Sequence, residues 1–549
     1  MDAETDPFDG STIPVAFIFG LYRGDTDEYW EFESLEKLMN FLSDKNWLVY
    51  AHNGGKFDYH LKCIGEDKSF REYINSDEPL MMISGRMAKF RIGECEFRDS
   101  MNILVNPLRA FAKEEIDYQK LHKDVRHLHM VEIRKYLKSD CVNLWDTINA
   151  YNTRYGVSLT QAGASMRYWQ KNHGTGFVKQ TLSQSAIYRE YYYGGRVQCF
   201  RQGTASSNFK VVDINSAYPF AMLHAHPFEP EARVQKHLPR VEHMGQCFVH
   251  LIAVAKGCFP LRTDDGLFFP DDERTPREYF VSGWELAAAL ELDAVKIIEI
   301  KKVHYFTQTV NFFDYINKFY VERKEAKAKG DKVGDVFAKL FMNSLYGKFA
   351  ADPTSYMEYV IASDDSLSDW CTSKFKWDAK EKKNVVEEYG YRRNQPWGDR
   401  HLLERELPEK KHTYYNVATA ASITGFVRAY LFRALRQCSG LIYCDTDSIA
   451  AESIEGLTLG KELGQWKHEA DCVYYAVAGK KTYAFELTDG TYKTASKGVR
   501  LSPDEIIRAA EGEQVIYKPQ APTYSVMREN AVFVPRTVKM TAKDISQVR

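Results

Sequence analysis

The sequence lacks the features of a membrane or secreted protein. It has no apolar run long enough to cross a bilayer, and it does not open with the basic and then apolar residues of a signal peptide. Its 10 cysteines include no C-x-x-C pair, which argues against a zinc knot or a disulfide framework. We therefore expect a protein of a reducing, cytoplasmic setting that has no membrane partner.

The sequence also lacks an excess of positive charge. Its 73 Lys and Arg residues face 75 Asp and Glu residues, which leaves a net charge of −2. This balance does not exclude a nucleic-acid binder, because binding depends on local basic surface, and basic residues gather at 323–329 and 480–481. No internal repeat or low-complexity tract is evident. With 549 residues, 44% of them apolar, the chain is long enough for several folded domains.

The most informative stretch is Y-C-D-T-D-S at residues 443–448. Apolar residues on both sides of it predict two short strands that meet at a tight turn. Asp445 and Asp447 would both project from this turn, where two carboxylates are costly to hold together without a cation. Oxygen ligands of this kind suit Mg²⁺ or Mn²⁺, which share substrate phosphates. An isolated D-x-D is more often a solvated hairpin turn, so the rest of the chain has to decide between the two interpretations.

Four further carboxylates occur in or near the first quarter of the chain. Asp2 and Glu4 lie on the same side of a predicted strand, and Asp58 follows a buried strand and a Gly-Gly turn. Asp140 lies four residues after Tyr136 on a predicted helix, so these two side chains share a face. Each motif alone is more often surface than catalysis. Together, four carboxylates can hold two divalent ions.

Two further patterns lie in the middle of the chain. A buried β-branched run ends on Asp213, and the chain turns shortly after Tyr218. Further on, Lys339, Asn343 and Tyr346 fall on one stripe of a predicted helix, although such a stripe can also be a plain helix surface.

Two S-x-x-E patterns predict where further helices begin. Ser282 and Ser502 would cap these helices, and Glu285 and Glu505 would complete a capping box in each. The second of these helices would open a small carboxy-terminal domain.

Taken in order, these patterns resemble the motifs of the B-family DNA polymerases. Y-C-D-T-D-S resembles motif C, D-I-N-S-A-Y-P at 213–219 resembles motif A, and K-x-x-x-N-S-x-Y-G at 339–347 resembles motif B. The amino-terminal D-x-E, N-x-x-x-F-D and Y-x-x-x-D resemble the three exonuclease motifs of proofreading polymerases. Two insertions, at 225–312 and 352–411, are typical of the protein-primed branch found in phages, including tectivirus-like ones.

The resemblance implies an α/β multidomain fold, with a ribonuclease-H-like exonuclease domain and a right-hand polymerase domain that carries two insertions. The implied divisions are an exonuclease domain (1–150), a connecting segment (151–190), the two parts of a palm (191–224 and 412–500), the first insertion (225–312), fingers (313–351), the second insertion (352–411) and a thumb (501–549). In the family a hydrophobic half-strand precedes the D-x-E, but here Asp2 is the second residue. An unpaired terminal strand is expected to fray, so either the sequence begins after its natural start or the exonuclease is weakened.

The resemblance also assigns roles to individual residues. Asp213, Asp445 and Asp447 would be catalytic in polymerisation, with Asp213 and Asp447 as metal ligands. The implied nucleotide-binding residues are Tyr218, which would exclude a 2′-hydroxyl, Arg323, Lys327, Lys339, Asn343 and Tyr346. The implied exonuclease residues are the metal ligands Asp2, Glu4, Asp58 and Asp140, with Tyr136 and an auxiliary Lys120. The implied DNA-binding residues are Tyr192, Gly194, Gly195, Gly347, Asn53, Phe57 and Ser100, together with Lys481 and Tyr483, which are expected on one strand face.

The expected function is template-directed DNA synthesis with 3′→5′ proofreading, using two Mg²⁺ (or Mn²⁺) ions in each active site. The substrates would be primer-template DNA and deoxynucleoside triphosphates, and we expect a monomer. A separate terminal protein would supply the priming hydroxyl for a linear viral or plasmid genome. Two alternatives remain open. One is a primer-independent polymerase of the same family, and the other is a catalytically degenerate DNA-binding replication scaffold.

Overall fold

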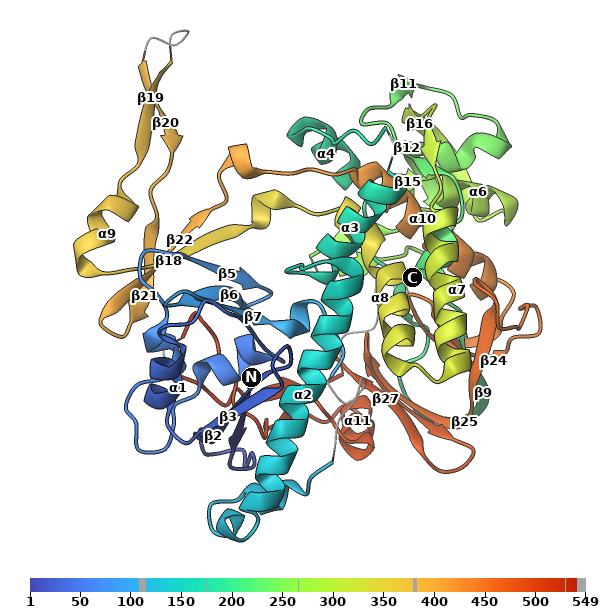
Figure 1. Ribbon diagram of the computed structural model, residues 1–549. Helices are drawn as coiled ribbons and strands as arrows, with labels where there is room; N and C mark the ends of the chain where they lie inside the picture. Colours follow the sequence, from blue (N-terminus) through green and yellow to red (C-terminus); the bar gives the residue numbers. More distant parts are fainter. Residues whose placement is uncertain (108–114, 175, 265, 379–382, 529, 541–549) are drawn as a thin grey trace.

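The computed structural model describes residues 1–540, apart from 108–114, 175, 265, 379–382 and 529. The chain forms a mixed α/β fold of several parts, in which two seven-stranded sheets are the largest elements (Figure 1). Within the described residues, no helix is long and apolar enough to span a membrane.

The amino-terminal part contains a three-stranded sheet crossed by one long helix. Gly20 makes this crossing possible, because a Cβ atom at its position would lie 2.8 Å from Leu137 Cγ on the helix. The close approach places the first strand beside the helix face that carries Tyr136 and Asp140. The elements are β1 (Asp2–Thr5), β2 (Ala16–Arg23), β3 (Glu28–Phe32), α1 (Leu35–Leu42) and α2 (Met130–Tyr155).

The prediction that the first strand frays is wrong. β1 pairs antiparallel with β2, with Asp2 opposite Gly20 and Glu4 opposite Ile18. Met1 is buried, and its amino nitrogen donates to the carbonyl oxygen of Tyr50 at 2.9 Å. Strand β1 is therefore held both by β2 and, through Met1, by the neighbouring strand β4 (Leu48–Ala51).

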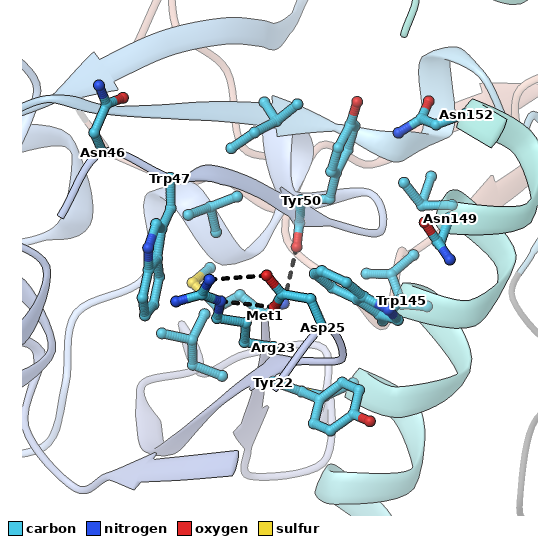
Figure 2. A pocket seen from close by; sticks show the side chains of 16 residues that line it. Met1, Tyr22, Arg23, Asp25, Asn46, Trp47, Tyr50, Trp145, Asn149 and Asn152 are labelled. Carbon is cyan, nitrogen blue, oxygen red and sulfur yellow. Dashed lines mark hydrogen bonds and ion pairs between the residues drawn. The ribbon is translucent and has the colours of Figure 1, made fainter. Parts of the chain in front are cut away.

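A cavity of about 310 Å³ lies beside Met1, between β2, β4 and α2. Figure 2 shows the rings of Trp47 and Trp145 on its walls, with the ion pair between Arg23 and Asp25 in its middle. None of the residues that line the cavity is a predicted site residue. The geometry of the candidate sites therefore has to be built from the motif residues themselves.

The segment predicted to be the second insertion (352–411) shares a sheet with the amino-terminal part. Strand β18 (Met357–Ala362) pairs with β5 (Pro79–Ile83), with Tyr359 opposite Leu80. The sheet order is β21-β22-β18-β5-β6-β7-β4, and the hairpin β19–β20 projects away from it (Figure 1). The remaining elements are β6 (Arg86–Ile92), β7 (Cys95–Asp99), α9 (Asp364–Cys371), β19 (Lys374–Asp378), β20 (Lys383–Glu388), β21 (Arg392–Trp397) and β22 (Arg400–Glu406).

The other seven-stranded sheet carries the central motifs in the order β27-β26-β25-β9-β24-β23-β8. Behind it lies α10 (Val417–Leu435), in which nearly every residue is buried. The antiparallel pair α7 (Phe313–Lys329) and α8 (Lys332–Phe349) packs against this core (Figure 1). The strands are β8 (Val197–Cys199), β9 (Gly203–Ile214), β23 (Ser439–Asp445), β24 (Ser448–Ser453), β25 (Trp466–Gly479), β26 (Thr482–Leu487) and β27 (Tyr492–Ser496).

The first insertion is a four-stranded sheet covered by a helix. Both predicted capping boxes are confirmed, since Ser282 caps α6 (Gly283–Glu291) and Ser502 caps α11 (Pro503–Ala510). After α11 the chain returns to the amino-terminal part, where Tyr524 packs into its core. The other elements of these regions are α3 (Gln161–Asn172), α4 (Leu182–Arg189), α5 (Ala217–Ala221), β11 (Arg233–Gln235), β12 (Cys247–Ala255), β15 (Arg277–Ser282), β16 (Val295–Tyr305), β28 (Val515–Tyr517) and β29 (Arg536–Val538).

Candidate active sites

The acidic turn at 443–448 forms as predicted and meets the end of β9. Strand β23 ends at Asp445, and β24 begins at Ser448, which pairs with Asp213. The backbone nitrogen of Ile214 donates to the carbonyl oxygen of Asp447 at 2.7 Å. These contacts place Asp213, near the end of β9, beside Asp447 in the turn that precedes β24.

Burial and neighbouring carboxylates raise the pKa of both Asp213 and Asp447. Burial, followed by the charge of Asp447, raises the pKa of Asp213 to about 7. Burial, followed by the charge of Asp445, raises the pKa of Asp447 to about 6. Glu469, which no motif indicates, adds to both effects from strand β25. A divalent cation would relieve this repulsion, so the pair fits a metal that takes its remaining ligands from substrate and water.

Asp445 is held by a different set of contacts. Lys481 Nζ lies 2.9 Å from its Oδ1 atom, and the hydroxyl of Thr446 donates to the same oxygen at 3.0 Å. The prediction that Lys481 lies on a strand face is wrong, because it occupies the turn before β26 with φ +58°. Tyr483 does lie on β26, where its ring packs against Tyr443 at 4.9 Å. Both residues therefore face the acidic turn, but from different local structures.

Motifs A and B meet through two tyrosines. The rings of Tyr218, on α5, and Tyr346, on α8, stack with centroids 4.1 Å apart and planes 8° apart. Lys339 and Asn343 lie on the same helix as Tyr346, and the amide of Asn343 donates to the carbonyl of Lys339. Arg323 forms an ion pair with Asp335 at 2.8 Å, whereas Lys327 is exposed.

Residues 192–195, called the Y-x-G-G segment below, lie directly on the acidic turn. The nitrogen of Thr446 donates to the carbonyl of Arg196 at 2.7 Å, and a Cβ atom on Gly195 would lie 2.5 Å from Thr446 Oγ1. Glycine at 195 is thus required by this approach. Behind the segment, the buried Arg428 on α10 donates to the carbonyls of Tyr193 and Gly194.

Arg428 also forms a buried ion pair with Glu285, at 2.7 Å. Glu285 belongs to the capping box of α6, so one carboxylate links the first insertion to the Y-x-G-G segment. Sequence reasoning missed Arg428. The sequence does offer one signal, because Arg428 stands among apolar residues in the central turns of helix α10. Burying an arginine there is costly unless its charge is paired.

The amino-terminal carboxylates converge on the crossing of β1 and α2. Asp58 is buried, and burial, followed by the charge of Asp2, raises its pKa well above the usual value. Burial also raises the pKa of Tyr136, with contributions from Asp140 and Glu4. The Oδ1 atom of Asp58 is buried without a hydrogen-bond partner among the described residues. An oxygen in this situation is suited to binding a metal ion.

In the described part of the chain, no group of three or more His, Cys, Asp or Glu residues is arranged as a complete metal site. Lys120 pairs with Glu132 on α2 at 2.8 Å. Ser100 is fully buried and contacts His52, while the ring of Phe57 packs edge-on against Phe8 and Tyr524.

Comparison with known proteins agrees with this geometry. Residues 111–429 match the family of DNA polymerases of type B, organellar and viral. A DNA-directed DNA polymerase of Enterobacteria phage PRD1 is 32% identical over 98% of this chain and 97% of its own length. A DNA polymerase of Bacillus phage Nf is 23% identical over 88% of this chain and 85% of its own length.

Solved structures give the same result for the fold. Phi29 DNA polymerase in complex with primer-template DNA and incoming nucleotides has a TM-score of 0.69 at 18% identity, covering 98% of this chain and 99% of that one. Its orthorhombic crystal form has a TM-score of 0.68 over the same shares. The family predicted from the motifs is confirmed, as is a mixed α/β multidomain fold. The chain is a DNA-directed DNA polymerase and belongs to the organellar and viral family of type B.

Proposed function

We propose that this polymerase extends a primer at Asp213 and Asp447 and removes nucleotides from a 3′ end at Asp2, Glu4, Asp58 and Asp140. In this proposal the β9-containing sheet is the palm, α7 and α8 are the fingers, and α11 opens the thumb. The amino-terminal part is a ribonuclease-H-like exonuclease domain. The observation that carries the proposal is the adjacency of Asp213 and Asp447, with Asp447 close enough for its charge to act on both stacked tyrosines of motifs A and B.

The chain's own residues account for nucleotide selection. An incoming deoxynucleotide would lie with its sugar against Tyr218, whose ring is kept in place by the stack with Tyr346. A 2′-hydroxyl would collide with this ring, so ribonucleotides are excluded. Lys339 and Lys327 would neutralise the triphosphate, joined by Arg323 once it exchanges Asp335 for phosphate.

Other residues around Asp213 and Asp447 would hold the DNA. Lys481 and Tyr483 would grip the primer end, and the Y-x-G-G segment would contact the template through its exposed Gly194. Two Mg²⁺ or Mn²⁺ ions, when bound by Asp213 and Asp447, would polarise the phosphate and stabilise the attacking and leaving oxygens.

The exonuclease part of the proposal rests on the second carboxylate cluster. Asp2, Glu4, Asp58 and Asp140 would hold the metal ions, and Tyr136 would orient the attacking water. Asn53 and Phe57 would hold the single-stranded 3′ end beside them. Ser100 is buried, so it would act on this strand through His52, which its hydroxyl contacts at 2.9 Å.

A gel assay with a labelled primer on a longer template tests both activities. Extension with Mg²⁺ and deoxynucleotides should fall by about 10³-fold in Asp447→Asn, which keeps the side-chain shape but removes the charge. Asp58→Ala should extend normally but no longer shorten the primer when nucleotides are left out. An Asp447→Asn enzyme that extends at the normal rate would refute the assignment of the polymerase site.

We further propose that a terminal protein supplies the first hydroxyl, based on the two insertions beside the central motifs. The first insertion is tied to the Y-x-G-G segment by Glu285 and Arg428, which suits a surface that positions a primer. Incubation of a template and labelled nucleotide with and without the terminal protein separates the alternatives. Covalent labelling of that protein supports the proposal, whereas equal synthesis on a bare template would identify a primer-independent enzyme.

A further inference from the structure

We propose that Arg86 is a positioning residue for the exonuclease, acting through Asn53. It fixes the amide of Asn53 so that its nitrogen, rather than its oxygen, is presented to the single-stranded 3′ end. This inference rests on the proposed exonuclease function and deepens it. None of the motifs singled out in the sequence includes Arg86.

Asp99 holds the backbone of the loop that carries Asn53. Its carboxylate is fully buried at the end of β7 and accepts hydrogen bonds from the backbone nitrogens of Asn53 at 3.0 Å and Gly55 at 3.2 Å. It also accepts from the nitrogen of Met101 at 2.9 Å. Asn53 has φ +65° and ψ +15°, a left-handed conformation that L-residues rarely adopt without such support.

Arg86 neutralises Asp99 and orients the side chain of Asn53. Its Nη1 atom lies 2.7 Å from Asp99 Oδ2 and donates to Asn53 Oδ1 at 3.1 Å. A guanidinium group has donors but no acceptor, so the amide atom that faces it must be the oxygen. The amide nitrogen of Asn53 therefore points to the other side, where the described residues provide it with no hydrogen-bond acceptor.

The local fold explains why Arg86 reaches this loop. Ser84 and Gly85 have φ +50° and φ +72°, as in the two-residue turns that join tightly paired strands. Arg86 is the first residue after this turn, at the start of β6. The loop packs tightly on β6, because a Cβ atom on Gly55 would lie 2.2 Å from the carbonyl oxygen of Met87.

The chemistry that results is specific. A 3′-terminal nucleotide presents phosphate, sugar and base oxygens, all of which accept hydrogen bonds from an amide N–H. If the amide of Asn53 were reversed, its oxygen would face these acceptors and repel them. The ion pair between Arg86 and Asp99 is largely buried, with 15% and 0% of the side chains exposed, so it holds the amide orientation firmly.

The test compares steady-state degradation of a 5′-labelled single-stranded oligonucleotide by the full chain and its variants. Arg86→Ala should raise KM for the oligonucleotide by about 10- to 100-fold, the range for a lost hydrogen bond to a charged group, and change kcat much less. Arg86→Lys should give an intermediate KM. Arg91→Ala, on the same strand, should match the wild type, and primer extension by Arg86→Ala should be normal, which shows that the variant is folded.

A double-mutant cycle separates positioning from a merely structural effect. If Arg86 acts through Asn53, adding Arg86→Ala to Asn53→Ala should leave KM within about twofold of Asn53→Ala alone. The inference is overturned if Arg86→Ala raises KM as much in the Asn53→Ala variant as it does in the wild type. It is also overturned if Arg86→Ala alone leaves KM unchanged. A wild-type enzyme without metal-dependent degradation would instead refute the exonuclease assignment itself.

Discussion

Enlarging Gly195 perturbs the proposed polymerase site at one defined contact. A Cβ atom at this position would lie 2.5 Å from Oγ1 and 2.7 Å from Cγ2 of Thr446. Real contacts of this kind are longer than 3 Å, so Gly195→Ala must push the turn away by about half an ångström or more. Thr446 joins Asp445 to Asp447, and its φ of +60° leaves its backbone little freedom to yield.

We expect Gly195→Ala to slow primer extension by about 10- to 100-fold, because misplacement of reacting groups by up to 1 Å costs rates of this order. The exonuclease rate on single-stranded DNA should be unchanged, since its carboxylates lie in the amino-terminal part. Thr446→Gly should restore much of the rate in the double variant, because it removes the clashing atoms. Normal extension by Gly195→Ala, or a double variant as slow as Gly195→Ala, would refute the reasoning.

Gly194→Ala is the matched control for this prediction. A Cβ atom at 194 has no atom within 4 Å, so the folded protein can accommodate it. Thermal unfolding of Gly194→Ala should therefore match the wild type, whereas Gly195→Ala should unfold at a lower temperature, since overpacking costs about 1–3 kcal/mol.

Three further predictions follow from other contacts. Tyr218→Val should lower the preference for deoxynucleotides over ribonucleotides by about 10²-fold in single-turnover incorporation, and an unchanged preference would contradict the proposed exclusion. Arg428→Ala should lower the free energy of unfolding in urea by about 3–5 kcal/mol, since it leaves a buried carboxylate unpaired, while Arg433→Ala, which breaks a half-exposed ion pair between the same two helices, should cost under about 1 kcal/mol. Equal losses in the two arginine variants would show that burial is not decisive. Burial lowers the pKa of His226 to about 3, so its contribution to stability is complete above pH 6.5 and is lost as the pH falls towards 3. The wild type should lose about 2 kcal/mol more than His226→Gln between pH 7 and pH 5, and parallel pH profiles for the two proteins would count against this.

Local patterns were sufficient for many individual elements. The strands on either side of 443–448, the helix that carries Tyr136 and Asp140, and both capping boxes are where the sequence predicts them. Each of these depends on residues within a few positions of one another. The prediction for Lys481 is wrong for a local reason as well. Residues 480–481 form a two-residue turn in which Lys481 has positive φ, and lysine is not a residue type that indicates such a turn.

Long-range packing decided what the patterns could not indicate. The sequence predicts fraying at Asp2 because a half-strand is missing before it, yet β2 and the contact of Met1 with Tyr50 hold the strand. The boundaries drawn for the second insertion do not reveal that β18 pairs with β5. Glu469 lies near Asp213 only because β25 and β9 are neighbours in the sheet.

The sequence by itself determined which chemistry this protein can perform. Carboxylates, tyrosines and lysines at motif spacing identified the family, since each motif occupies one strand, turn or helix. The tertiary structure alone decided how the motifs support one another. Arg428 beneath the Y-x-G-G segment and Arg86 beside Asn53 come from distant parts of the chain, and their effect depends on burial and direction, which no local pattern encodes.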